Sequence, residues 1–169
     1  MGYSAWKNRV IGQGSMKSNW RLSFNLAPSK TSPDWQTCLR ITDHAPGNER
    51  NVLGLWFIPD TLHMRMHFAF DITDNNQSGN PPAFDVPPLT VNEQNTIEIS
   101  QMVKDGKTVL VFKLNGYTYH NKVNENPHMY PALDFYYAMG SWNGVSADMR
   151  DFQYYSSDLA TDIPAVSGT

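Results

Sequence analysis

The sequence predicts an all-β fold, an antiparallel two-sheet jelly-roll sandwich formed by a single domain over residues 1–156. Short runs in it alternate between apolar and polar residues, which is typical of strands with one buried face. Turn-forming residues, including 11 Gly and 11 Pro, separate these runs. No window holds a helical pattern, because prolines and glycines interrupt every candidate.

The first half of the chain contains four expected strands. Residues 20–26 alternate without a break, and residues 38–42 form a second run. Residues 51–58 are apolar apart from the first, which is typical of a strand buried on both faces. Residues 62–71 alternate most clearly of all, and Pro59-Asp60 supplies the turn before them.

The second half begins with an expected loop over residues 71–89. Further strands are expected over residues 96–102, 108–114, 117–123, 133–139 and 149–155. Tight turns at Lys104-Asp105-Gly106-Lys107 and at Asn115-Gly116 join the first three of these strands. Residues 157–169 are interpreted as a polar C-terminal tail or linker.

Composition excludes several function classes. The net charge of −3 gives no support to a surface for nucleic acid or for an anionic membrane. The one cysteine, Cys38, excludes an internal disulfide and a cysteine-based zinc site, and we expect it to be a buried small apolar residue. The longest uncharged apolar stretch, residues 53–59, is too short to span a membrane.

Three stretches resemble the concanavalin A-like lectin/glucanase superfamily and its laminin-G-like domains. Residues 92–101 resemble one strand of those domains, residues 105–116 the next hairpin with its Asn-Gly turn, and residues 149–154 the final strand. The resemblance implies a bent double-sheet fold and a non-catalytic lectin- or adhesion-type domain that binds carbohydrate or an extracellular partner. It also implies an extracellular or surface-exposed location, although no secretion signal opens the chain.

The same comparison gives no catalytic residue. The paired glutamates of the glucanase branch and the His-x-Asn-x-Arg run of galectins are absent from the sequence. The calcium cluster of legume lectins has no counterpart either. The resemblance therefore predicts a fold and a general kind of ligand, without a named activity.

A polar stripe of His63, Arg65 and His67 lies on the expected strand over residues 62–71, opposite its apolar residues. At strand spacing the two histidines are about 13 Å apart, too far to share one metal ion. Planar groups with several donors suit sugar hydroxyls, carboxylates or sulfates. The stripe is therefore a candidate ligand-binding surface, and its alternative is an ordinary solvated sheet face.

Trp142 lies between two glycines with Asn143 beside it. A large aromatic residue on a loop is poorly explained by core packing. Its ring can instead stack on a sugar, while the Asn143 side chain forms a hydrogen bond with a hydroxyl of that sugar. The alternative is that Trp142 closes the end of the sandwich. Trp35, also in a loop, has the same interpretation, while Trp20 and Trp56 lie in strands and are expected in the core.

Asp71, Asp74 and Asn75 concentrate oxygen ligands at the end of an expected strand. Calcium requires six to eight oxygens, and such a cluster can supply several of them. Asp and Asn also favour turns, which is the simpler interpretation. Calcium is the one cofactor that the sequence suggests.

Two other function classes stay open. A polysaccharide hydrolase or lyase of the same fold needs two carboxyls across a cleft, and Glu98 and Asp134 are the candidates, because each lies opposite apolar neighbours in a strand. A structural or assembly subunit, such as a coat, matrix or viral surface protein, predicts a large interface between copies of the chain. Its 8 Met suit such adaptable contacts, so a homo-oligomer is possible.

Overall fold

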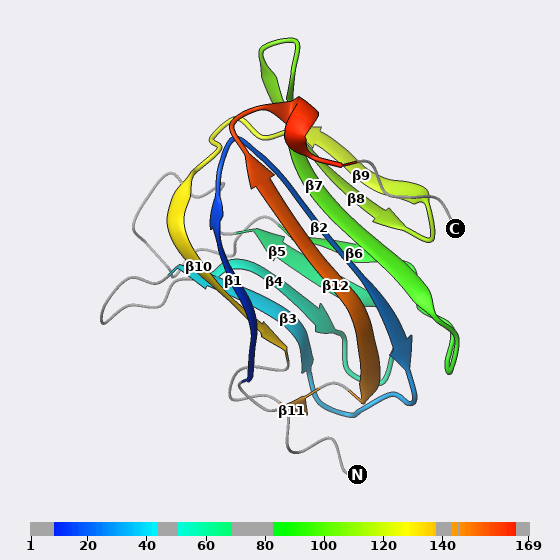
Figure 1. The fold of residues 1–169 in the computed structure, drawn as a ribbon. Helices are drawn as coiled ribbons and strands as arrows, with labels where there is room; N and C mark the ends of the chain where they lie inside the picture. The colour runs from blue at the N-terminus through cyan, green and yellow to red at the C-terminus, as the bar shows by residue number, and fades with distance from the viewer. Residues whose placement is uncertain (1–8, 44–50, 69–82, 138–142, 145, 165–169) are drawn as a thin grey trace.

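The computed structural model describes residues 9–43, 51–68, 83–137, 143–144 and 146–164, which form two stacked sheets (Figure 1). Sheet A consists, in order, of β1 (Arg9–Met16), β10 (Tyr130–Tyr137), β3 (Gln36–Asp43), β4 (Asn51–Phe57), β5 (Met64–Phe68) and β6 (Ala83–Val86), with β11 (Asn143–Gly144) beside β3. Sheet B consists, in order, of β12 (Ala147–Ser157), β2 (Asn19–Pro28), β7 (Asn95–Lys104), β8 (Lys107–Leu114) and β9 (Tyr117–Val123).

Neighbouring strands pair antiparallel throughout the described residues, apart from the short parallel contact of β11 with β3. The predicted antiparallel jelly-roll sandwich is confirmed. Among the described residues, no helix is long and apolar enough to cross a membrane.

Inward-pointing side chains from both sheets make the core. The largest fully buried ones include Trp20, Phe24, Phe57, Phe112 and Phe135. The alternation predicted over residues 20–26 is confirmed, because every second side chain of this run belongs to that core. Cys38 is buried as expected, and burial raises the pKa of its thiol well above the ordinary value.

Both predicted hairpin turns are present. The turn between β7 and β8 has positive φ at Asp105 (52°) and Gly106 (73°), and the turn between β8 and β9 has positive φ at Asn115 (51°) and Gly116 (81°). Two consecutive positive φ angles define the type I′ turn, whose twist matches that of the flanking strands. These two dipeptides therefore set the register of the β7–β8–β9 meander.

Several strand boundaries were predicted wrongly. No strand was expected at β1, where Gly12 and Gly14 break the alternation and two register shifts displace the pairing with β10. β6 was missed because prolines flank it on both sides, so that the sequence predicted a loop over residues 71–89. Such prolines are tolerated beside an edge strand. β10 begins earlier than the expected run over residues 133–139, of which residues 138–139 lie outside the described part of the chain.

The chain after β12 continues in a short 3₁₀ turn, Ala160–Asp162. Lys17 forms an ion pair with Asp158 at 2.8 Å between Nζ and Oδ2, and Ile163 is buried. The described part of the C-terminal segment therefore packs against the sandwich as far as Ile163.

Aromatic contacts bridge the two sheets along both long sides of the sandwich. On one side, His120 of β9 stacks on Phe84 of β6, with ring centroids 4.2 Å apart and planes 7° from parallel. On the other side, Phe135 of β10 contacts Phe152 and Tyr154 of β12, at 5.5 and 4.6 Å between centroids. The aromatic contacts between β6 and β9 thus include a titratable imidazole, whereas those between β10 and β12 do not.

Candidate functional site

The outward face of sheet A carries the polar stripe singled out in the sequence. On β5 the side chains of Met64, Met66 and Phe68 are buried, so Arg65 and His67 point away from the core. The predicted alternation is confirmed over β5. The expected start of the strand at residue 62 was wrong, because Leu62 and His63 precede β5, and residues 69–71 of the expected strand lie outside the described residues.

Arg65 and Asp85 form a bidentate pair across β5 and β6. Arg65 donates from Nε to Asp85 Oδ1 at 2.6 Å and from Nη2 to Oδ2 at 2.9 Å, and the two residues are in register. These bonds lower the pKa of Asp85 and raise that of Arg65, so both groups stay charged at neutral pH. Asp85 was not predicted, because it lies within the expected loop over residues 71–89.

Trp35 covers one side of this pair. The Arg65 guanidinium carbon lies 5.5 Å from the centroid of the Trp35 ring, which is within cation–π range. The loop before β3 holds Trp35 there, since the Asp60 amide donates to the Ser32 carbonyl at 2.6 Å and the Asp34 amide donates to Ser32 Oγ at 3.2 Å. The structure therefore brings Trp35 and Arg65 together, two residues predicted from separate segments.

Trp56 belongs to the same surface, and its expected place in the core was wrong. Its chain neighbours Leu55 and Phe57 are buried, so its own indole points outward. The ring lies over Gly54, where an added Cβ would be only 1.6 Å from Trp56 Cη2. His67 contacts the indole edge to face, with centroids 5.0 Å apart and planes at 85°. Gly54 therefore provides the space that the ring occupies.

The two histidines of the stripe are held differently. Burial lowers the pKa of His67, and the nearby charge of Arg65 lowers it further, so its imidazole is neutral at pH 7 and can accept as well as donate. His63 Nδ1 lies 3.0 Å from the carbonyl oxygen of Val86. Since a carbonyl only accepts, Nδ1 carries the hydrogen, and Nε2 of His63 is left for another partner.

A buried hydroxyl lies in the same cross-strand row. Thr37 pairs with Trp56, which in turn pairs with Arg65. The Thr37 side chain is buried, and its Oγ1 has no hydrogen-bond partner in the described part of the chain. A buried hydroxyl without a hydrogen-bond partner lowers the stability of the folded state.

The backbone of β11 approaches the same end of β3. Asn143 pairs with Gln36, the residue after Trp35, and Gly144 pairs with Thr37. The fold thus places the Asn143 backbone beside the Trp35 segment. The Asn143 side chain and all of Trp142 lie outside the described residues, so their predicted binding roles stay predictions.

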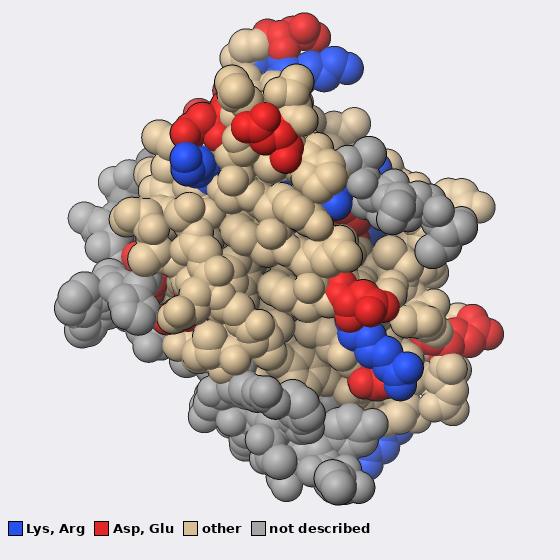
Figure 2. Space-filling view, viewed as in Figure 1, with Lys and Arg blue, Asp and Glu red and all other residues tan. Residues whose placement is uncertain are grey.

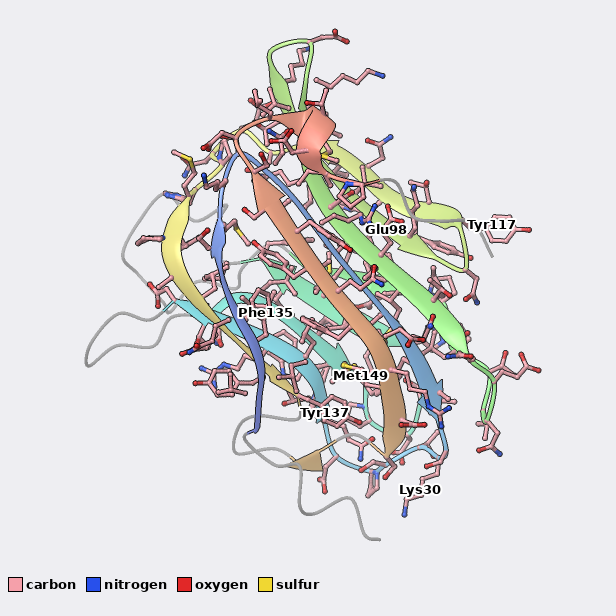
Figure 3. The ribbon with its side chains drawn as sticks, in the orientation of Figure 1. Lys30, Glu98, Tyr117, Phe135, Tyr137 and Met149 are labelled. Carbon is pink, nitrogen blue, oxygen red and sulfur yellow. The ribbon has the colours of Figure 1, made fainter. Side chains whose placement is uncertain are left out.

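The carboxylate pair considered for a hydrolase is wrong. Glu98 of β7 points outward from sheet B, where it contacts Lys113 at 3.3 Å (Figure 3). Asp134 of β10 points outward from sheet A and accepts a hydrogen bond from Gln13 Nε2 at 2.7 Å. The two carboxylates lie on opposite faces of a sandwich whose sheets alone are about 10 Å apart, so they cannot flank one glycosidic bond.

The predicted calcium ligands Asp71, Asp74 and Asn75 lie outside the described residues, so that site stays a prediction. Within the described ranges, no group of three or more His, Cys, Asp or Glu side chains is placed to hold a metal ion.

The sequence matches no protein-family model and no curated protein. Its fold matches solved structures at low sequence identity. A Trypanosoma rangeli sialidase in complex with sialic acid has a TM-score of 0.58 and 13% identity, over 86% of this chain and 22% of the sialidase. An endo-β-1,4-glucuronan lyase from the fungus Trichoderma reesei has a TM-score of 0.57 and 9% identity, over 89% of this chain and 73% of the lyase.

Sheep galectin-11 has a TM-score of 0.51 and 7% identity, over 85% of this chain and 98% of the galectin. At these identities the likeness concerns the fold alone, and the resemblance to concanavalin A-like sandwiches is confirmed at that level. The chain spans about a fifth of the sialidase that it matches, 22%.

Proposed function

We propose that this domain recognises carbohydrate on the outward face of sheet A, through Trp35, Trp56, Arg65 and His67, with His63 at the border of the site. One observation carries the proposal: two tryptophans lie beside a bidentate Arg–Asp pair on the outward face of sheet A. Aromatic side chains gathered on a surface and rimmed by polar groups are typical of ligand-binding or partner-binding sites.

The groups on this face complement the two chemical surfaces of a sugar ring. The rings of Trp35 and Trp56 offer flat apolar area for the C–H face of a pyranose. Around them, His67 and His63 Nε2 can bond hydroxyls as donors or acceptors, and Arg65 Nη1 adds a donor that Asp85 does not use.

The structural neighbours support the ligand class. A sialidase in complex with sialic acid, a glucuronan lyase and a galectin are all named for carbohydrates or carbohydrate binding. The extracellular or surface location, and an extracellular protein as a partner, remain part of this proposal. The proposal is one of recognition without catalysis, because the carboxylate pair considered for a hydrolase lies on opposite faces of the sandwich.

Isothermal titration calorimetry against a panel of soluble oligosaccharides tests the proposal. Trp35→Ala and Trp56→Ala should each weaken binding about tenfold, which corresponds to about 1.4 kcal/mol of lost stacking. Tyr117→Ala is the matched control, because it removes an aromatic ring that is 73% exposed on β9 of sheet B (Figure 3). Failure of every oligosaccharide to bind, or equal binding by the tryptophan variants and the wild type, would contradict it.

The assembly-subunit alternative makes a different prediction for the isolated chain. A subunit that functions by self-association needs an interface of more than about 1,000 Å² and should form oligomers at micromolar concentration. Light scattering measures this directly. A monomer that binds oligosaccharide supports recognition, whereas a stable oligomer with no sugar affinity favours assembly.

A further inference from the structure

We infer that this site selects neutral, hydroxyl-rich sugar units over acidic ones such as uronates, sialates or sulfated sugars. The inference rests on the proposed function and adds the class of ligand. It follows from the charge balance of the outward face of sheet A and from the two hydrogen bonds by which Asp85 already occupies the Arg65 guanidinium.

Among the described side chains, the formal charges of the guanidinium and carboxylate groups on this face cancel. The outward face of sheet A carries, in this part of the chain, the guanidinium groups of Arg40 and Arg65 and the carboxylates of Asp85 and Asp134. Asp34, next to Trp35, adds a further carboxylate at the edge of the site. An acidic ligand would therefore meet a surface with no excess of positive charge to attract it.

Arg65 lies beside Trp35 and pairs with Trp56 across β5 and β4, and Asp85 already fills its anion-binding fork. The Nε and Nη2 donors both bond Asp85, at 2.6 and 2.9 Å, and Trp35 covers the guanidinium at 5.5 Å. A ligand carboxylate would have to displace Asp85 or approach it against like-charge repulsion. A sugar hydroxyl can use the remaining donor at no such cost.

Of the neighbouring groups, Arg40 keeps the charge already counted above, and His67 adds none. His67 is neutral at pH 7, because burial and the Arg65 charge both lower its pKa. Arg40 lies in the row of Gly54 and His67, and its Nε donates to Asn51 Oδ1. The dominant surface left for a ligand is aromatic, which suits stacking on an uncharged pyranose.

Matched ligand pairs test the inference by calorimetry. Lactose is compared with sialyllactose, and cellotetraose with tetraglucuronate, at about 20 mM and about 300 mM NaCl. We expect the neutral member of each pair to bind more tightly, with an affinity that changes less than about twofold between the two salt concentrations. Tighter, salt-sensitive binding of the acidic members would overturn the inference and leave the proposed function intact. Absence of binding by all four sugars would overturn both.

Asp85→Asn tests the role assigned to the Arg65–Asp85 pair. It removes the carboxylate that neutralises Arg65 and should strengthen binding of sialyllactose or tetraglucuronate about tenfold at low salt. Asp105→Asn makes the same charge change at the exposed β7–β8 turn, where Asn tolerates positive φ, and should have no effect. If Asp85→Asn also leaves acidic-sugar affinity unchanged, Asp85 does not set the ligand class.

Discussion

Two arginines, one on each outer face of the sandwich, differ in how their charge is compensated. Arg65 on sheet A lies 5.5 Å from the ring of Trp35, and Arg21 on sheet B lies 5.2 Å from the ring of Tyr155. Arg65 also forms two hydrogen bonds with Asp85. Arg21 is only 4% exposed, and its Nε has no hydrogen-bond partner in the described residues.

The two arginines differ because one lies on the proposed recognition surface of sheet A and the other on a packed surface of sheet B. On sheet A the charged groups are paired and partly exposed, so their donors and the aromatic rings beside them are available to a ligand. On sheet B, Arg21 is covered and its cross-strand neighbour Ser100 is buried too. Figure 2, which views this face, shows mostly uncharged side chains over its centre and a group of acidic and basic side chains over the lower half of β12, the strand that carries the Arg150–Asp148 ion pair. The aliphatic stem of Arg21 therefore acts chiefly as packing material.

The largest expected effect on binding comes from Gly54→Ala on sheet A. The added methyl would lie 1.6 Å from the present position of Trp56 Cη2, so the indole must leave its place beside His67. Because that ring end can move outward, the fold should survive while oligosaccharide affinity falls more than about tenfold. Calorimetry measures the affinity and circular dichroism the fold. Ser23→Ala on sheet B is the control, and equal losses in both variants would contradict the assignment of the site.

The next prediction concerns stability and uses Arg21. Arg21→Met keeps most of the volume and removes a buried cation that lacks a carboxylate partner in the described residues, so unfolding free energy should be unchanged or rise by about 1 kcal/mol. Urea denaturation measures it. A loss of more than about 2 kcal/mol in unfolding free energy would mean that a favourable partner stabilises the Arg21 charge. Arg21 would then not differ from Arg65 in how its charge is compensated.

Arg65→Met is the counterpart on sheet A and should change stability little. The Arg65 and Asp85 side chains are 36% and 47% exposed, and ion pairs of this exposure contribute about 0–1 kcal/mol. Binding should fall, because the cation beside Trp35 and the donor at Nη1 are both lost. Urea denaturation and calorimetry on the same variant separate these effects. A large loss of stability with unchanged affinity would reverse the roles given to the two faces.

The smallest expected effect is a pH dependence from His67 and His120. The pKa of each of these two histidines lies below the ordinary value of 6.5, chiefly because the imidazole is partly buried. The unfolded chain therefore binds more protons than the native state as pH falls below that value, and stability decreases from about pH 8 to about pH 5. The lowered pKa of Asp85 keeps this carboxylate charged across the window.

Thermal melts at the two pH values measure this decrease. His120→Gln and His67→Gln should each reduce the difference between the melting temperatures, even though loss of the His120–Phe84 stack lowers both temperatures. His128→Gln, a change at an exposed histidine, is the control. An unchanged pH difference in both test variants would show that other groups set it.

Local pattern predicted most of the fold because strands and tight turns have local signatures. The alternation over residues 20–26 and the two-residue turns at Asp105-Gly106 and Asn115-Gly116 place β2 and the β7–β9 meander. β1 was missed, since its glycines and register shifts remove the period, and β6 was missed because prolines surround a strand that only its pairing with β5 defines.

The candidate site was predictable only in part. Arg65 and His67 follow from alternation within one strand, but the pairing of Arg65 with Asp85 joins residues 20 positions apart and depends on sheet register. Trp56 was placed in the core, because a run of apolar residues hides which side each one faces. Gly54 gives the missing signal, since a glycine two residues before a strand tryptophan leaves space for the ring to lie outward.

The most direct test of carbohydrate recognition on sheet A is a titration followed by the tryptophan indole N–H signals in a two-dimensional ¹⁵N NMR spectrum. On addition of a neutral oligosaccharide that calorimetry shows to bind, the signals of Trp35 and Trp56 should shift, while that of Trp20, which is buried in the core, should stay in place. Binding that leaves Trp35 and Trp56 unmoved, or that shifts only backbone signals of sheet B around Arg21 and Tyr155, would contradict the assignment.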